Sequence, residues 1–266
     1  RRFAEGGFKV LGVDPAQNIA DQACVAGIPT LPEFFSVPLS EDILKENSTA
    51  QYVIARNVIP HVKDVRSVIG GMARLLDPIS GVGIIEFHYA KAILDELHYD
   101  SIYHEHLLYL TGGSLNRLIN ESGMHIFDVG KSPISGGSLV AYFSKSPRSP
   151  SEDWLEILKG EETQGVNSLQ RWQEFARACE QHARRLKALV ENRIAKENKL
   201  LVGYGASARS STLLNYCKIG NSHLSAVIDK SPLKVGKYTP GSDILIIDFD
   251  EGVRQIKQGK RTVLLL

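Results

Sequence analysis

Four proton-handling side chains stand together at Tyr103, His104, Glu105 and His106. They follow an apolar run at residues 82–87, which is typical of a buried strand. Tyr, His and Glu can between them abstract a proton, relay it and stabilise the oxyanion that forms. The segment is therefore a candidate for general acid–base chemistry.

Two other interpretations of these four residues remain open. His104 and His106 could bind a metal, although no third ligand is evident and no metal is predicted, and the cluster could be structural, with hydrogen bonds satisfied under a loop. If the segment forms a helical turn, Tyr103 and His106 share a face. His106 could then take a proton while the Tyr103 hydroxyl stabilises the oxyanion, and His104 is predicted to be structural.

A second pattern, Gly203-x-Gly205-x-x-Ala208, lies between a predicted strand at residues 199–202 and a helix that runs through Leu214. Glycines in this context let the backbone approach a pyrophosphate, and the helix N-terminus offers N–H groups to it. Asp229 ends the next predicted strand, at residues 224–229, where a ribose-binding acid is expected. Arg209 could add a charge to the pyrophosphate contact. A tight turn that serves only packing is the alternative.

Three polar residues in the first part of the chain follow predicted strands. Asp14 ends an apolar run at residues 8–15, whereas Asn57 and His61 follow one at residues 51–58. Strands alternating with helices predict a parallel sheet, and ligands bind beyond the carboxyl ends of its strands. Asp14 could bind a ribose or cap a helix. A single His such as His61 is more often structural, but its position at this edge also allows a catalytic or supporting role.

The order of predicted elements indicates an α/β chain with two Rossmann-like three-layer units joined by a helical segment. Strands are predicted at residues 8–15, 51–58, 81–87 and 136–143, with helices at residues 18–26 and 64–76 between them. The polar segment at residues 146–150 then leads to a long helix whose apolar residues, from Trp172 to Val190, recur at helical spacing. We assign residues 1–146 to one domain and residues 147–266 to the helical segment and a second domain.

The composition describes an ordinary globular protein. Thirty-one basic and thirty acidic residues leave a net charge of +1, which favours neither a nucleic-acid nor a membrane partner. The three cysteines are scattered and form no C-x-x-C pair, so a cytoplasmic location is predicted. No apolar run is long enough to span a bilayer. We expect the natural polypeptide to extend beyond both ends of this chain.

The sequence resembles the sugar C-methyltransferases that act on nucleotide-activated keto-deoxysugars. The segment at residues 100–106 resembles the hallmark of that family. Further similar blocks occur in the same order along nearly the whole chain, at residues 12–15, 57–61, 136–139, 203–208, 213–216, 229–234 and 240–241.

The resemblance implies a domain for S-adenosylmethionine (SAM), a catalytic segment, and a C-terminal domain that binds a nucleoside-diphosphate sugar. Asp14 and Asn57 would then contact SAM. His61, Tyr103, Glu105 and His106 would surround the sugar. The sugar nucleotide would be bound by five residues of the second pattern: Gly203, Gly205, Ser207, Arg209 and Asp229.

The chain departs from the family in several places. The family's cysteine-rich zinc module and its Gly-rich SAM loop are absent from these residues, so zinc is expected only in a module outside this chain. Ser135 stands where the family often has His, and Arg209 where it usually has Lys. The loop that accompanies Asp14 is expected N-terminal to Arg1.

These observations predict a SAM-dependent C-methyltransferase in which His106 deprotonates the carbon next to a sugar ketone. Tyr103 and Glu105 would stabilise or orient the enolate. One alternative is an NAD(P)-dependent oxidoreductase that uses the pattern from Gly203 to Asp229. Another is a non-catalytic module that binds a nucleotide sugar.

Overall fold

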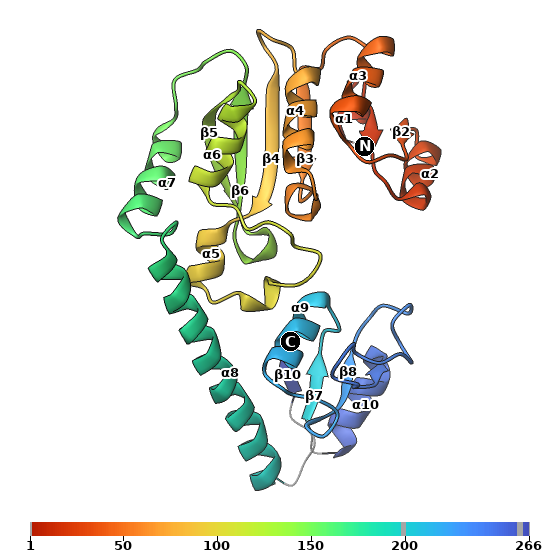
Figure 1. The fold of residues 1–266 in the computed structure, drawn as a ribbon. Helices are drawn as coiled ribbons and strands as arrows, with labels where there is room; N and C mark the ends of the chain where they lie inside the picture. The colour runs from red at the N-terminus through yellow and green to blue at the C-terminus, as the bar shows by residue number, and fades with distance from the viewer. Residues whose placement is uncertain (1, 198–200, 260–262, 266) are drawn as a thin grey trace. The chain divides into compact units, whose positions relative to one another are not determined.

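The computed structural model describes residues 2–197, 201–259 and 263–265, and the chain forms two compact units (Figure 1). Unit 1 comprises Arg1–Tyr89 and Leu107–Gln164, and unit 2 comprises Ala90–His106 and Gly165–Leu266. The predicted α/β class is confirmed. The units divide the chain differently from the predicted ranges 1–146 and 147–266. Residues 147–164 belong to unit 1, and residues 90–106, with the candidate catalytic segment, belong to unit 2.

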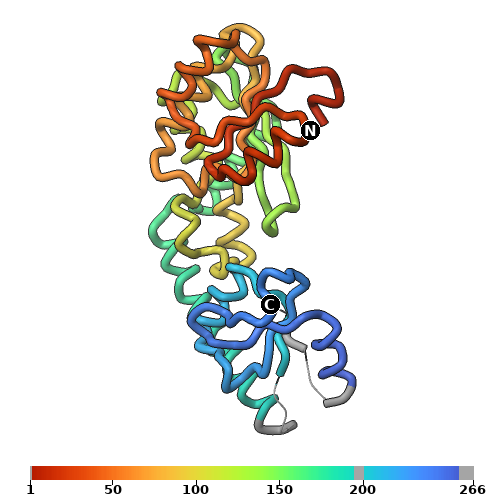
Figure 2. Tube along the Cα trace, turned by 90° about the vertical axis from the view of Figure 1, so that its right-hand side faces the viewer, coloured from red at the N-terminus to blue at the C-terminus, as the bar shows by residue number. Residues whose placement is uncertain are grey.

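Unit 1 is built on a mixed sheet of order β3-β4-β6-β5. β3 (Tyr52–Arg56) and β4 (Val82–His88) are parallel, as predicted. The strand predicted at residues 136–143 is β6 (Ser138–Ser144), but it runs antiparallel between β4 and β5 (His125–Ser132), a strand that was not predicted. The connection between β5 and β6 contains the short helix η3 (Ile134–Gly136) and extends from the rest of unit 1 as a green loop in Figure 2. A wholly parallel sheet is therefore wrong for unit 1.

The first predicted strand is shorter than expected. Only Gly12–Val13 form a strand, β1, which pairs in parallel with β2 (Thr30–Leu31) in a separate two-stranded sheet. The helix predicted at residues 18–26 is α2 (Gln17–Val25), and α1 (Arg2–Glu5) precedes β1. The helix α3 (Val37–Glu46) begins after Ser36, whose side chain accepts a hydrogen bond from the Leu39 N–H. It packs against α4 (Val65–Leu75), which matches the helix predicted at residues 64–76.

Polar contacts fix the N-terminus of α6 in unit 1, and one of them comes from α7. Thr111 and Ser114 form a reciprocal capping box at the start of α6 (Gly112–Glu121). The buried Glu161, on α7 (Glu152–Thr163), accepts hydrogen bonds from the Gly112 and Gly113 N–H groups at 2.5 and 2.9 Å. A carboxylate at this position also interacts favourably with the helix dipole. Both helices pack on β5.

Unit 2 contains a wholly parallel sheet of order β10-β7-β8-β9. Its strands are β7 (Leu201–Tyr204), β8 (Leu224–Ile228), β9 (Ile246–Ile247) and β10 (Val263–Leu265), linked in part by α9 (Ala208–Tyr216) and α10 (Phe249–Gly259). The first strand lies between the second and the last, so chain order reverses beside β7. Ligands of open α/β sheets bind at such a point. Residues 199 and 200 of the strand predicted at residues 199–202 lie outside the described residues.

The long helix predicted after residue 150 is present as α8 (Leu169–Glu197). Phe175, Cys179 and Val190 on it are buried, which confirms them as packing residues. Unit 2 also contains α5 (Ala90–Asp95) and the short helix η2 (Tyr99–Ser101), which contacts α9.

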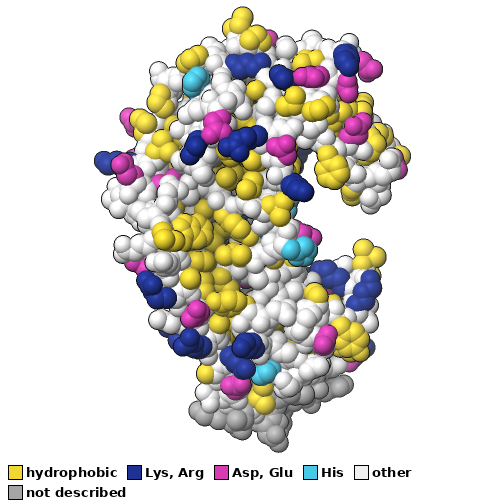
Figure 3. Space-filling model, viewed as in Figure 1, with side chains coloured by type: hydrophobic (Ala, Val, Ile, Leu, Met, Phe, Trp, Pro, Cys, Tyr) yellow, Lys and Arg dark blue, Asp and Glu magenta, His cyan; other side chains and the backbone are white. Residues whose placement is uncertain are grey.

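None of the helices in the described ranges is both long and apolar enough to cross a bilayer. On the face shown in Figure 3, basic and acidic side chains are interspersed. This distribution agrees with the near-balance of charges in the sequence.

Candidate functional site

Tyr103 and His106 contact each other, as predicted, although through a single turn and not within a helix. The His106 N–H donates to the Tyr103 carbonyl at 2.9 Å, and this bond closes the turn. The two rings lie 4.3 Å apart between centroids, with an interplanar angle of 37°. The Tyr103 hydroxyl is 3.2 Å from His106 Nε2. The turn therefore joins a hydroxyl and an imidazole nitrogen into one hydrogen-bonded pair.

The tautomer of the neutral His106 ring follows from its second contact. Its Nδ1 lies 2.8 Å from the Ser101 carbonyl oxygen, which can only accept a hydrogen bond. Nδ1 therefore carries the proton, and in the neutral ring Nε2 keeps its lone pair. The hydroxyl of Tyr103 then donates to Nε2. This tautomer is the one that a general base acting through Nε2 requires.

The environment of Tyr103 keeps its hydroxyl protonated. Burial raises the pKa of this phenol, and the nearby Glu105 carboxylate raises it further, whereas Arg209 acts in the opposite sense. Glu105 and His104 are both exposed. Of the four residues, only Tyr103 and His106 thus form a partly buried pair that could meet a substrate as donor and acceptor.

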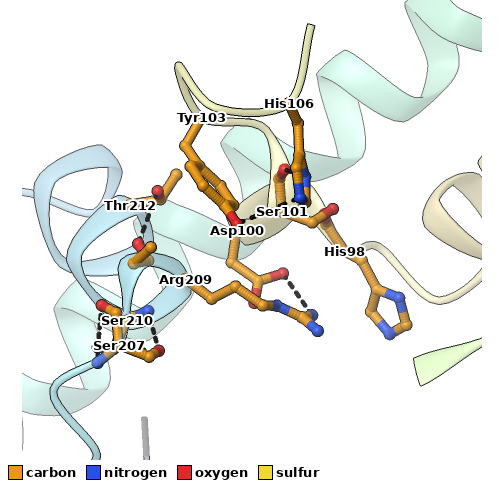
Figure 4. A network of polar contacts seen from close by, with 10 residues as sticks. His98, Asp100, Ser101, Tyr103, His106, Ser207, Arg209, Ser210 and Thr212 are labelled. Carbon is orange, nitrogen blue, oxygen red and sulfur yellow. Dashed lines mark hydrogen bonds and ion pairs between the residues drawn. The ribbon is translucent and has the colours of Figure 1, made fainter. Parts of the chain in front are cut away.

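An ion pair attaches this segment to α9 (Figure 4). Arg209 donates from Nε to Asp100 Oδ2 at 2.6 Å and from Nη2 to Asp100 Oδ1 at 3.1 Å. Such a two-point contact fixes direction as well as distance. The Arg209 predicted to bind the pyrophosphate thus connects the start of α9 to the residues immediately before Tyr103. Asp100 was not predicted as a site residue, although it begins the hallmark segment.

A second anchor lies just before Asp100. The buried Tyr99 hydroxyl is 2.8 Å from Nδ1 of His182 on α8 and 3.3 Å from Sγ of Cys217, at the end of α9. Burial raises the pKa of Tyr99, as does its hydrogen bond with Cys217, so the phenol stays neutral. His98 lies near the Asp100–Arg209 ion pair in Figure 4, and burial and Arg209 lower its pKa. The chain that leads into the candidate catalytic segment is thereby held by two helices of unit 2.

The predicted phosphate-binding pattern has the local structure that its sequence implies. Gly203 is buried in β7, and Gly205 adopts a positive φ of 101°, which L side chains rarely adopt. Ser207 caps α9: its hydroxyl accepts from the Ser210 N–H at 3.1 Å in a capping box. The turn thus leads directly from a buried strand to the N-terminal amides of a helix.

Asp229 follows β8 and supports this turn. Its Oδ2 accepts from the Ala206 N–H at 2.9 Å, and its Oδ1 accepts from the Ser231 N–H at 2.8 Å. Lys234 donates to Asp229 Oδ2 at 3.1 Å and to the Ala206 carbonyl at 2.7 Å. Burial acts to raise the Asp229 pKa, but these hydrogen bonds outweigh it and the pKa is lowered. Ribose binding by this carboxylate stays a prediction, and the role of Lys234 in fixing the turn was missed.

The two residues predicted to contact SAM lie at carboxyl ends of strands in unit 1. Asp14 follows β1, and its Oδ1 accepts from the Ala16 N–H at 2.9 Å. Its Oδ2 has no hydrogen-bond partner among the described residues. Asn57 follows β3 with a φ of 55°, a conformation that Asn tolerates better than most residues. A carboxylate and an amide at strand ends fit the hydroxyl and polar groups of a nucleoside cofactor.

His61 occupies a separate turn of unit 1. It is exposed and ends the short helix η1 (Ile59–His61). The Leu107 N–H donates to the Pro60 carbonyl at 2.7 Å, so the chain directly after His106 is bonded to this turn. The catalytic role predicted for His61 stays a prediction.

A buried acid in the sheet of unit 1 was also missed. Glu86 on β4 accepts from Arg56 Nε at 2.6 Å and from Ser132 Oγ at 2.9 Å. The hydrogen bond from Arg56 is the main reason that the Glu86 pKa is lowered. The Glu86 carbonyl accepts from the Asn57 N–H at 2.9 Å, so this network fixes the strand end that presents Asn57. An acid within the apolar run at residues 82–87 was the available signal.

Comparisons with known proteins place the chain in a family. A methyltransferase domain family matches residues 1–128, and the family described as the C-methyltransferase C-terminal domain matches residues 133–264. The C-methyltransferase NovU of Streptomyces niveus is 33% identical over 248 residues, which are 92% of this chain and 58% of that protein. The chain belongs to the SAM-dependent C-methyltransferase family. It spans less than two thirds of the length of this relative.

Similarities to solved structures are weaker. Magnesium protoporphyrin IX methyltransferase from Synechocystis PCC 6803 with bound SAH has a TM-score of 0.43 and 14% identity, covering 55% of this chain and 68% of that one. The same enzyme with bound SAM has a TM-score of 0.41 and 15% identity, covering 55% and 63%. Because both domain families are methyltransferases, the oxidoreductase alternative is not favoured.

Proposed function

We propose that the protein transfers a methyl group from SAM to the carbon beside the ketone of a nucleotide-linked deoxysugar. The observation that carries this proposal is the ion pair between Asp100 and Arg209. It attaches the Tyr103–His106 pair to the N-terminal turn of α9, the position where a diphosphate would bind. A sugar on that diphosphate would therefore have the acid–base pair as its neighbour in the same unit.

The pair offers a keto sugar two complementary contacts. Nε2 of His106 takes the proton from the carbon beside the ketone, while the Tyr103 hydroxyl turns from Nε2 to donate to the ketone oxygen. The electrons of the broken C–H bond then form an enolate whose oxygen Tyr103 stabilises. The raised pKa of Tyr103 suits this role, because the phenol keeps its proton at neutral pH. Glu105 would orient the pair.

Asp14 and Asn57 would bind the methyl donor in unit 1. When bound, SAM supplies a sulfonium methyl group, which the enolate carbon takes up while the sulfur keeps the bonding electron pair. The second substrate is a nucleoside-diphosphate sugar, bound by Gly203, Gly205, Ser207, Arg209 and Asp229. General acid–base assistance by such a pair accounts for about 10²–10⁴-fold in rate.

Replacing the proposed base tests this function, and the chain contains a matched control two residues away. His106→Ala should lower methyl transfer to a nucleotide-linked keto sugar about 10²–10⁴-fold, while its affinity for the sugar nucleotide stays within about twofold of the parent's. His104→Ala, at an exposed neighbouring position, should retain activity. Methyl transfer can be followed with isotopically labelled SAM. Full activity in the His106→Ala protein would refute the assignment of the base.

A further inference from the structure

The Gly203–Ser207 turn defines two directions for a diphosphate bound at α9. One direction leads to the candidate catalytic segment, because Arg209 contacts Asp100. The other leads to the carboxyl end of β8, because the Ala206 N–H donates to Asp229. A nucleotide-linked sugar has two ends as well. If its sugar points to Tyr103 and His106, its nucleoside must point to the ends of β8 and β9.

An aromatic side chain is exposed at that edge. Phe249 directly follows β9 and Asp248, and it is 42% exposed. Its ring meets Tyr204, the last residue of β7, in an edge-to-face contact at 6.3 Å. Lys230, which follows Asp229, places its Nζ 5.3 Å from the centre of the Phe249 ring. Residues from the ends of three neighbouring parallel strands therefore converge on one ring.

The core of unit 2 does not account for Phe249. One apolar cluster of unit 2 comprises Val202, Ala226, Ile228 and Ile247, with Tyr204 and Ile256 packed against it. Phe249 is not part of it and keeps much of its surface in water. A cation over an exposed ring contributes little, and covering the ring with a flat aromatic ligand would add stacking energy.

We propose that Phe249, with Lys230 beside its face, forms the subsite for the base of the nucleoside-diphosphate substrate. The base stacks on the exposed ring, its ribose lies near Asp229, and its diphosphate lies at the start of α9. This inference rests on the proposed function, since it takes the substrate to be a nucleoside diphosphate, and it adds the orientation of that substrate. Aromatic stacking accepts any base, so the subsite defines the class of ligand.

Calorimetric titration with uridine, thymidine and adenosine diphosphates and with inorganic pyrophosphate tests the subsite. Removing an aromatic stacking partner costs about 1–3 kcal/mol per base. Phe249→Ala should therefore weaken the best-bound nucleoside diphosphate about tenfold or more, whereas pyrophosphate affinity should stay unchanged. Phe249→Trp, which keeps an aromatic ring at this position, should bind the nucleotide about as tightly as the parent. Arg209→Gln should weaken nucleotide and pyrophosphate alike, because it acts at the shared diphosphate.

The outcomes separate this subsite from the function on which it rests. Equal nucleotide affinity of the parent and the Phe249→Ala protein would overturn the subsite and leave the nucleotide site standing. Failure of the parent to bind any of the four probes would overturn both. A parallel loss of pyrophosphate affinity in Phe249→Ala would show damage to the turn and would also count against the subsite. Thermal unfolding of each variant verifies that α10 remains folded.

Discussion

The ion pair between Asp100 and Arg209 gives the sharpest test of how the catalytic segment is held. The Asp100 side chain is 23% exposed and the Arg209 side chain 34%. Arg209 donates two hydrogen bonds to the Asp100 carboxylate, at 2.6 and 3.1 Å. Exposed pairs contribute about 0.2–1 kcal/mol, and breaking a buried pair costs about 3–5 kcal/mol. For a partly buried two-point pair we therefore expect a coupling energy of about 1–2 kcal/mol.

A double-mutant cycle measures this energy directly. The parent, Asp100→Asn, Arg209→Gln and the double variant are unfolded in urea without ligand, so that no nucleotide contributes to the result. The two single changes should each lower the free energy of unfolding, and the second change should then cost about 1–2 kcal/mol less than it does alone. Additive effects, within about 0.3–0.5 kcal/mol, would show that the two side chains do not interact in solution.

The catalytic consequence is measured on the same variants. Asp100→Asn should lower kcat about tenfold, the equivalent of about 1.4 kcal/mol, because Tyr103 and His106 lose one of their anchors. The KM for SAM should stay unchanged, since its predicted contacts Asp14 and Asn57 belong to unit 1.

A similar ion pair away from the segment provides the control. The side chains of Arg171 and Asp95 are 30% and 31% exposed, and Arg171 Nη2 lies 2.8 Å from Asp95 Oδ1. Both residues also belong to unit 2. Asp95→Asn should lower stability and leave kcat unchanged. If Asp95→Asn lowers kcat as much as Asp100→Asn does, the effect is general destabilisation and the positioning role is refuted.

Two further predictions concern groups whose pKa values are shifted. Because Arg56 lowers the Glu86 pKa in the folded state, Glu86 stabilises the fold above the unfolded pKa, and this contribution is lost as pH falls through the folded pKa. Glu86→Gln should thus lower the free energy of unfolding in urea by about 1 kcal/mol at pH 7 and by progressively less below about pH 5. A loss of stability that increases as the pH falls would contradict this prediction. Burial raises the pKa of Cys179 to about 11 and also raises the pKa of Cys217. At pH 8 iodoacetamide should therefore label the exposed Cys24 first, which mass spectrometry of the folded protein would show. Equal labelling of all three thiols in the folded protein would contradict this prediction, whereas in urea the three thiols should be labelled equally.

Most elements of the fold could be predicted because their periodicity is local. The helices α2, α4 and α8 and the strands β3, β4 and β8 all lie close to the expected ranges. The direction of β6 could not be predicted in the same way. An apolar strand has the same composition whether it runs parallel or antiparallel, and the direction depends on its pairing with β5.

The extent of β1 depends on partners as well. Its apolar run covers eight residues, but a strand exists only where a neighbour accepts its hydrogen bonds. β2 pairs with only Gly12 and Val13. Phe8 and Leu11, which lie outside that pairing, are exposed.

The candidate site shows the same division between local and distant contacts. Tyr103 and His106 are three residues apart, so their contact followed from spacing alone. Asp100 and Arg209 are 109 residues apart, and nothing in either local sequence indicates the other. The same holds for Tyr99 and Cys217, which are 118 residues apart.

These distant contacts explain why compact unit 2 includes residues 90–106, which precede the predicted boundary at residue 146. Residues 90–106 lie between strands of unit 1 in the sequence, yet Tyr99 and Asp100 bond to α8 and α9 of unit 2. A proton-abstracting pair must keep its distance to the sugar within a fraction of an ångström. Anchoring the pair to the helix that would bind the diphosphate satisfies this demand, because the acid–base pair and its substrate then share one rigid support. The assignment of residues 90–106 to unit 2 is therefore what the proposed chemistry would require.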